Sequence, residues 1–137
     1  MPHRNQIDIQ ANWGDCDAAG IIFYPNYFRW FDECTQALLR SVGLSQRSLR
    51  DEFGIVGTAA VDASARFTAP VSYGDVLRAS SHVERWGTSS FTVYHRFERS
   101  AEVLAVEGRE VRIWAKLEPD GRLRTEPIPE AFRRLFA

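Results

Sequence analysis

The sequence has few of the residues that build disulfides, metal centres and histidine-based active sites. Its 137 residues include only two cysteines, Cys16 and Cys34, and three histidines. The cysteines lack the repeated spacing of a disulfide framework or a zinc site. We therefore expect two reduced cysteines, as in a cytoplasmic protein, and no metal centre.

Excess charge and long apolar runs are also absent. The chain has 17 Lys and Arg residues against 18 Asp and Glu residues, a net charge of −1. This balance gives no electrostatic reason to expect nucleic acid or an anionic membrane as a partner. No apolar run approaches the ~18 residues of a membrane span, and no apolar signal segment follows the polar residues 1–6. A cytoplasmic location is the expectation.

What the chain does have is alternation of apolar and polar residues, which predicts strands. The pattern begins over residues 7–13 and returns over residues 61–69, 77–84, 91–98 and 103–117. In the last stretch, Val111 and Ile113 are predicted to face the core with Ala115 and Leu117, opposite Arg112 and Trp114. Glu107–Arg109 interrupts the alternation and predicts a bulge.

One long amphipathic helix is predicted over residues 26–42. Gly43 follows as a stop, Pro25 presets φ for the first turn, and Asn26 is expected to cap it. Shorter segments are indicated at residues 44–53, a helix or irregular turn, and at 127–136, a short helix. The apolar side of the long helix is aromatic and contains Tyr27, Trp30, Phe31, Cys34, Leu38 and Val42.

These elements predict one α+β domain over residues 1–137, with the long helix on one face of a five-stranded antiparallel sheet. One helix cannot cover a long sheet of that size. We therefore expect a homo-oligomer, because a second copy would bury the remaining surface.

The stretch Trp13–Tyr27 contains the candidate catalytic residues. Asp15 and Asp17 stand in a loop of small residues where Gly20 lets the chain turn, directly before the helix. A helix start offers unpaired N–H groups and partial positive charge. A carboxylate beside such donors suits a base or nucleophile next to an anion site. The alternative is that both acids only form the turn.

The same loop imitates part of a calcium-binding loop, with acids at the first and third positions and Gly20 at the sixth. However, Ala19 stands at the fifth position, and Asn26 stands at the twelfth, where a bidentate Glu is required. Calcium is therefore rejected.

Residues 15–28 also resemble the active-site signature of the 4-hydroxybenzoyl-CoA thioesterase-like branch of the hotdog-fold superfamily. Residues 54–58 and 67–77 resemble the same branch, and the similarity covers nearly the whole chain. The resemblance implies a hotdog fold and hydrolysis of an acyl-CoA to free acid and CoA, without a cofactor. It also implies a homodimer or homotetramer, with active sites at the dimer interface.

The resemblance implies particular roles in catalysis. Asp17 matches the branch's catalytic carboxylate, either base or nucleophile, and the backbone N–H of Tyr24 matches the group that polarises the thioester carbonyl. Asp15 is the weaker candidate and is expected to brace the loop by accepting backbone N–H bonds. Asp32 matches a helix acid near the pocket. Thr58 matches a position that contacts the acyl group, although packing at a strand entry is an equal alternative.

The residues expected to bind CoA depart from the branch, whose members often carry a basic cluster after the tryptophan that corresponds to Trp86. Here Arg85 stands alone before Trp86, and Thr88, Ser89 and Ser90 are left to donate hydrogen bonds to phosphate. The flat aromatic side chains around the loop and the helix favour the binding of an aromatic acyl group. The alternative is that these side chains only pack the core. They are Phe23, Tyr24, Tyr27, Phe28, Trp30 and Phe31.

Three other functions are weighed against aromatic acyl-CoA hydrolysis. A short-chain aliphatic acyl-CoA thioesterase and a non-catalytic acyl-CoA-binding module both stay open. A hydratase would need a histidine with an acid, but none of His3, His82 and His95 lies in the loop or the helix. His95 has the strand position of a core residue, so a buried, hydrogen-bonded histidine is predicted there. Glu33 is expected on a solvated helix face.

Overall fold

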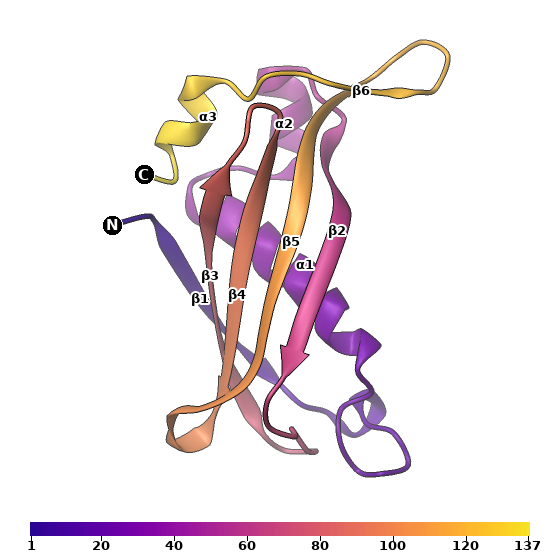
Figure 1. The fold of residues 1–137 in the computed structure, drawn as a ribbon, viewed down its shortest axis with the longest axis vertical. Coiled ribbons are helices and arrows are strands. Elements are labelled where there is room, and N and C mark those ends of the chain that lie inside the picture. Colours follow the sequence, from indigo (N-terminus) through magenta and orange to yellow (C-terminus); the bar gives the residue numbers. More distant parts are fainter.

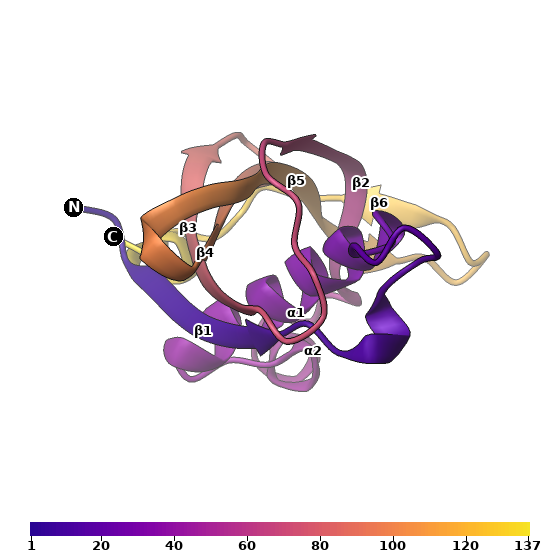
Figure 2. The same cartoon turned by 90° about the horizontal axis from the view of Figure 1, so that it is seen from below.

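One long helix lies against the inner face of a curved antiparallel sheet (Figure 1). The computed structural model describes residues 1–137, apart from the side chain of residue 101. Figure 2 shows the sheet bending around α1. The helices are α1 (Pro25–Ser41), α2 (Gln46–Phe53) and α3 (Glu130–Arg134), with 3-10 turns η1 (Trp13–Asp15) and η2 (Ser100–Glu102). The strands are β1 (Arg4–Gln10), β2 (Gly57–Phe67), β3 (Val76–Trp86), β4 (Ser90–Arg99), β5 (Val103–Leu117) and β6 (Leu123–Thr125).

The strand order is β1-β3-β4-β5-β2, and all neighbours are antiparallel. The prediction of an α+β chain with one long helix on a five-stranded antiparallel sheet is confirmed for these strands. The short strand β6, which was not predicted, pairs with Ala115–Leu117 at the end of β5. β1 and β2 are the outer strands of this order, so one edge of β2 pairs with no other strand among the described residues, although side chains bond to the backbone of Thr58 near its start.

Helix α1 begins one residue earlier than predicted. Pro25 occupies the first helical turn, Tyr24 is the N-cap residue, and Gly43 follows the last turn at a φ of 84°. The prediction that Asn26 caps the helix is wrong, because its side-chain Nδ2 donates instead to the Asp15 carbonyl at 2.9 Å. This bond ties the first helical turn to the preceding loop.

The bulge predicted at Glu107–Arg109 is also wrong. These residues pair in unbroken register with both β4 and β2, and the irregularities lie elsewhere in the sheet. Gly108 instead allows a close approach of α1. A Cβ atom there would lie 2.2 Å from Cζ of Phe31, a distance that side chains cannot tolerate. The Phe31 ring in turn stacks on His95, with centroids 4.9 Å apart.

Strand β5 turns the opposite face to the core from the one predicted. Glu110, Arg112 and Trp114 are buried, whereas Val111 and Ile113 are only half-buried. The Trp114 ring packs among aromatic residues, 4.7 Å from the Phe132 ring between centroids. The two charges are buried because they have partners across the core, as described below.

The end of the sheet near α2 and α3 has its own apolar cluster. The stretch 44–53 resolves into α2, which Ser45 caps by accepting a hydrogen bond from the Ser48 N–H at 3.1 Å. The predicted terminal helix is shorter than expected and covers only Glu130–Arg134. Among the described residues, no helix is long and apolar enough to cross a membrane. The cluster contains Leu38, Leu39, Leu49, Ile55, Phe91, Trp114, Phe132 and Phe136.

Candidate active site

The loop before α1 folds as a small hairpin. The Asp17 N–H donates to the Ile21 carbonyl and the Phe23 N–H donates to the Asp15 carbonyl, both at 2.9 Å. Cys16 and Ile22 form the antiparallel bridge between them. Gly20 makes the turn at a φ of 81°, a left-handed conformation that favours glycine. The second arm runs directly into α1, so the hairpin and the helix start form one unit.

Asp15 braces this unit, as predicted. One carboxylate oxygen, Oδ2, accepts the Asn12 N–H at 2.9 Å, and the other accepts Arg29 from α1 at 3.3 Å. The side chain is only 16% exposed. Because both oxygens are engaged, Asp15 is poorly placed to attack or deprotonate a substrate.

Asp17 differs from Asp15 in being exposed. Its Oδ1 accepts the Ala19 N–H at 2.9 Å, which fixes the side chain across the turn, and no described residue donates to Oδ2. The carboxylate lines a pocket of about 320 Å³ with Trp13 and Tyr73, whose rings meet edge to face at 5.6 Å between centroids. One oxygen is therefore free for chemistry beside two aromatic rings.

The Tyr24 N–H is the donor nearest the start of α1. Pro25 has no N–H, and no described residue accepts a hydrogen bond from the Tyr24 N–H. The 17-residue helix behind it carries partial positive charge at this end. The hairpin thus holds a free carboxylate oxygen and a free N–H close together in the chain, an arrangement suited to a carbonyl that becomes an oxyanion.

Tyr27 is both a core residue and a pocket wall, the two roles that the sequence left open. It is buried, and its ring packs 5.4 Å from the Phe67 ring between centroids. It also lines a mainly apolar pocket of about 330 Å³ next to the hairpin, together with Ile21, Ile22, Phe67 and residues 68–71. Burial, followed by the neighbouring Cys16 and Asp75, raises the Tyr27 pKa to about 12. The phenol is therefore neutral and acts as a wall of the pocket.

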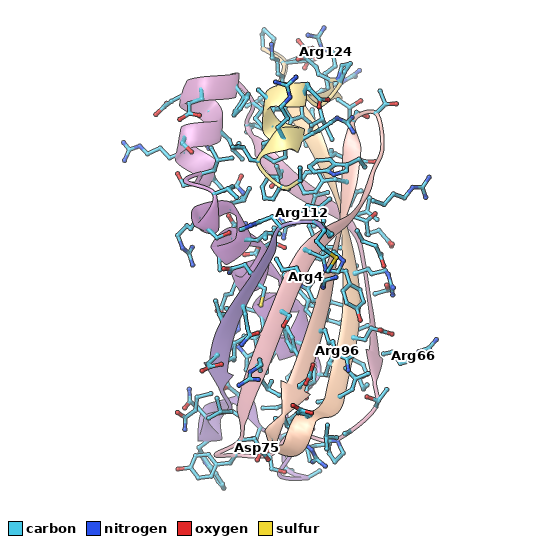
Figure 3. All side chains as sticks on the ribbon, turned by 90° about the vertical axis from the view of Figure 1, so that its left-hand side faces the viewer. Arg4, Arg66, Asp75, Arg96, Arg112 and Arg124 are labelled. Atoms are coloured by element: carbon cyan, nitrogen blue, oxygen red, sulfur yellow. The ribbon has the colours of Figure 1, made fainter. Side chains whose placement is uncertain are left out.

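Asp32 and Thr58 are brought together by a residue that the sequence interpretation missed. Arg112 of β5 is labelled in Figure 3. It donates to the Asp32 carboxylate at 2.9 Å and to the Thr58 carbonyl at 2.8 Å. Its other carboxylate partner is Glu110, at 2.7 Å. A signal was present, since Glu110 and Arg112 are two residues apart and so share a face of a strand.

Residues 86–90, at the turn between β3 and β4, lie at the opposite end of the sheet from the loop that joins β1 to α1 and contains Asp17 (Figure 1). Trp86 packs with Phe91 and α3, and the Arg133 guanidinium lies 5.4 Å from its ring centroid. The Thr88 carbonyl accepts the Ile128 N–H at 2.9 Å, which ties the turn to the C-terminal segment. Within one chain, Trp86, Thr88, Ser89 and Ser90 therefore do not join the site around Asp17.

The remaining polar predictions concern single residues. His95 is fully buried and bonded to Ser81 and Glu110, as predicted for a core histidine. Glu33 is half-exposed and pairs with Arg29 at 3.3 Å, as predicted for a solvated face. Among the described side chains, no group of three or more His, Cys, Asp and Glu residues is arranged to hold a metal ion.

Comparison with known proteins bears directly on this loop and helix. A family model described as the thioesterase-like superfamily matches residues 11–136. The chain belongs to this superfamily. The match spans the hairpin, α1 and the whole sheet except β1, so the resemblance noted in the sequence is confirmed.

Proteins similar to this chain include two that are named as enzymes. The 4-hydroxybenzoyl-CoA thioesterase of Pseudomonas sp. (strain CBS-3) is 34% identical, over 98% of this chain and 99% of that one. The 1,4-dihydroxy-2-naphthoyl-CoA hydrolase of Synechococcus sp. (strain WH7803) is 30% identical, over 67% of this chain and 64% of that one.

Solved structures of thioesterases have the same fold as this chain. A 4-hydroxybenzoyl-CoA thioesterase mutant complexed with 4-hydroxybenzoyl-CoA superposes with a TM-score of 0.91 at 31% identity, covering 98% of this chain and 99% of that one. A gentisyl-coenzyme A thioesterase gives a TM-score of 0.81 at 32% identity, covering 94% and 99%. The predicted hotdog fold is thereby confirmed for this superfamily member.

Proposed function

We propose that this chain is an acyl-CoA thioesterase that hydrolyses an aromatic acyl-CoA, of the 4-hydroxybenzoyl-CoA type, to the free acid and CoA. The observation that carries the proposal is the pairing of a free Asp17 carboxylate oxygen with a free Tyr24 N–H in one hairpin at a helix start. The named activities of similar superfamily members support the reaction class, because they act on aromatic acyl-CoAs.

The chemistry needs no more than these two groups. The Tyr24 N–H donates to the thioester carbonyl oxygen and stabilises the negative charge that develops there. Asp17 either removes a proton from the attacking water or attacks the carbonyl carbon itself. In the second route the CoA thiolate leaves first, and water then hydrolyses the resulting anhydride. Both routes release CoA and a carboxylic acid.

The acyl group is assigned to the mainly apolar pocket beside the hairpin. Tyr27 forms a flat wall there, which suits an aromatic ring. Asp32 and Thr58 do not line this pocket, because Thr58 and Phe67 lie at opposite ends of β2. We propose them as polar contacts for the acyl group that a second copy of the chain supplies. Trp86, Thr88, Ser89 and Ser90 are proposed for the CoA moiety.

The proposed contacts require more than one copy of the chain. Residues 86–90 and Asp17 lie at opposite ends of one sheet, so a single bound acyl-CoA meets both only if a second copy supplies one of them. The outer strand β2 also exposes Val61 and Phe67, at 58% and 48%. We therefore propose a homodimer or homotetramer with shared sites.

A kinetic panel tests the reaction and the acyl group together. Thiol release is measured with hydroxybenzoyl-, benzoyl-, butyryl- and hexanoyl-CoA, before and after treatment with a chelator. We expect the aromatic thioesters to give the higher kcat/KM, and the chelator to have no effect. Tight binding without hydrolysis would indicate a binding module instead, and a tenfold advantage for the aliphatic thioesters would contradict the aromatic assignment.

A further inference from the structure

Six polar side chains form a block on the outer face of the sheet, the face turned away from α1. Residues that pair directly across neighbouring antiparallel strands point to the same side of a sheet. The block has two adjacent rows across β1, β3 and β4, a row of Arg4, His82 and Tyr94 and a row of Gln6, Ser80 and Arg96. With Asn5, these side chains line a pocket of about 290 Å³. Arg4 and Arg96 are both labelled in Figure 3.

Arg4 has no carboxylate partner among the described residues. Its Nη1 lies 3.1 Å from Nδ1 of His82. Because an arginine only donates, Nδ1 accepts this bond and Nε2 carries the ring proton. Burial, followed by the Arg4 charge, lowers the pKa of His82, so the ring is neutral at pH 7. The acid two residues along β3, Glu84, accepts instead from Arg109 at 2.7 and 3.0 Å. The charge of Arg4 is therefore left without a counter-charge.

Arg96 also keeps donors to spare. Glu98 on the same strand accepts from Nε of Arg96 at 2.9 Å, and neither terminal nitrogen donates to a carboxylate among the described residues. Glu107, which pairs with Arg96 between β4 and β5, accepts from the Tyr94 hydroxyl at 2.7 Å. None of the residues that line the pocket is acidic. A wall with two guanidinium groups and no carboxylate favours an anion.

The positions of the two arginines suit a small anion between them. Arg4 lies on β1 and Arg96 on β4, and β3 runs between these strands. Neighbouring strands are ~4.8 Å apart, so the two backbones are separated by roughly 10 Å. Two long side chains can close that distance on one anion above Ser80 and His82. A guanidinium fork matches the oxygens of a phosphate group in pairs.

We propose that this pocket binds a phosphate group, held by Arg4 and Arg96 above Ser80 and His82. The two guanidinium groups supply the charge, and the Ser80 hydroxyl supplies a further donor. Two sources share this chemistry, free inorganic phosphate and the phosphate groups of a CoA molecule. Binding of this kind does not depend on whether the chain hydrolyses acyl-CoAs.

His82 reports binding directly. The chain has three histidines, so their ring signals are few enough to assign by NMR, and His82→Gln identifies the signals of His82. Inorganic phosphate is added to the parent protein at constant pH and ionic strength. We expect the His82 ring signals to shift until they saturate. His95, which is fully buried, and His3, which lies 2.8 Å from the Ser41 hydroxyl, should not shift.

Two variants test the arginines. Arg4→Gln and Arg96→Gln are each expected to raise the dissociation constant for phosphate about tenfold, because a hydrogen bond between charged groups is lost. Arg66→Gln is the matched control. Arg66 is exposed and lies two strands from Arg96 on the same face, in register with Glu107. Its replacement removes the same charge and should leave the dissociation constant unchanged. Unshifted His95 signals in each variant show that the fold is kept.

CoA and dephospho-CoA identify the source of the phosphate group. A His82 shift with CoA but not with dephospho-CoA would assign the pocket to the 3′-phosphate, and equal shifts with both would assign it to the diphosphate. A shift with inorganic phosphate alone would assign it to a free anion. Each of these results supports a phosphate site at Arg4 and Arg96.

Three results would overturn the site. The first is an equal His82 shift with sodium chloride at the same ionic strength. The second is an unchanged dissociation constant in both Arg4→Gln and Arg96→Gln. The third is no shift with any phosphate compound; a lower mass of Arg4→Gln by light scattering would then show that Arg4 contributes to contacts with a second copy. None of these measurements uses hydrolysis, so they fail or succeed separately from the proposed function.

Discussion

The His95 imidazole donates to the Glu110 carboxylate across 2.8 Å inside the core, between β4 and β5. Burial lowers the pKa of His95 despite the carboxylate beside it, so the ring is neutral near pH 7. Burial acts to raise the pKa of Glu110, but the His95 hydrogen bond and the Arg112 charge outweigh it and lower the value from 4.5 to about 2. The pair is therefore a carboxylate held by a neutral imidazole.

This pairing predicts loss of stability in acid. Below pH 6.5 the unfolded chain protonates His95 while the folded chain does not, and below pH 4.5 the same holds for Glu110. Both groups thus stabilise the fold at neutral pH and lose that contribution as the pH falls. A shift of this size for Glu110 corresponds to on the order of 3 kcal/mol.

The measurement is the free energy of unfolding by denaturant between about pH 2 and pH 8. Glu110→Gln should be less stable than the parent at pH 7, because Arg112 loses its buried partner, and should depend less on pH below 4.5. Glu33→Gln, on the exposed face of α1, is the control and should follow the parent curve. Equal pH dependence in parent and Glu110→Gln would contradict the assignment.

Asp17→Asn is expected to lower kcat about 10²–10⁴-fold, because the amide keeps the shape but cannot act as a base or nucleophile. Its melting temperature should stay near that of the parent, since Asp17 is exposed and makes one bond to the Ala19 N–H. Asp15→Asn provides the comparison. It weakens the hydrogen bonds of Asp15 to the Asn12 N–H and to Arg29, so we expect a loss of stability and a smaller loss of kcat than for Asp17→Asn. A larger loss of kcat for Asp15→Asn would assign the catalytic role to Asp15.

Gly108→Ala is expected to destabilise the fold, by roughly 1–3 kcal/mol or more, because the new methyl group would meet the Phe31 ring. Thermal unfolding measures the effect. Combining it with Phe31→Ala should be less harmful than the sum of the two changes, since the smaller side chain frees the space. Gly14→Ala is the control, because a Cβ there meets nothing within 4 Å. Additive effects would show that the contact does not limit packing.

Val61→Lys on the outer strand β2 is expected to weaken the proposed oligomer and to lower hydrolysis with it. A solvated lysine on an exposed strand edge opposes pairing with a second sheet. Mass measurement by light scattering at micromolar concentration, with activity on the same sample, checks both effects. Val76→Lys, at another exposed strand position, is the control. A parent that is fully active as a monomer would contradict shared sites.

The sequence by itself determined the parts of the protein that depend on neighbouring residues. The aromatic stripe of α1 follows from helical spacing, and Tyr27, Trp30, Phe31 and Cys34 are buried as predicted. The loop around Asp17 was readable in part, because Gly20 was expected to turn the chain and Pro25 to begin the helix, and both do so. Such features were predictable since the contacts that form them lie within a few turns of chain. The backbone pairing that makes this loop a hairpin was not predicted.

Only the tertiary structure decided which face of β5 enters the core. Apolar residues stand on both faces of that strand, so alternation alone gave no unique answer, and the pattern favoured Val111 and Ile113. Burying Glu110 and Arg112 instead is favourable only because His95 from the adjacent strand β4 and Asp32 from α1 bond to them. These partners lie 15 and 80 residues away in the chain. The apolar–polar pattern of one strand cannot show that these buried charges are paired, because the partners meet only when the three elements are packed together.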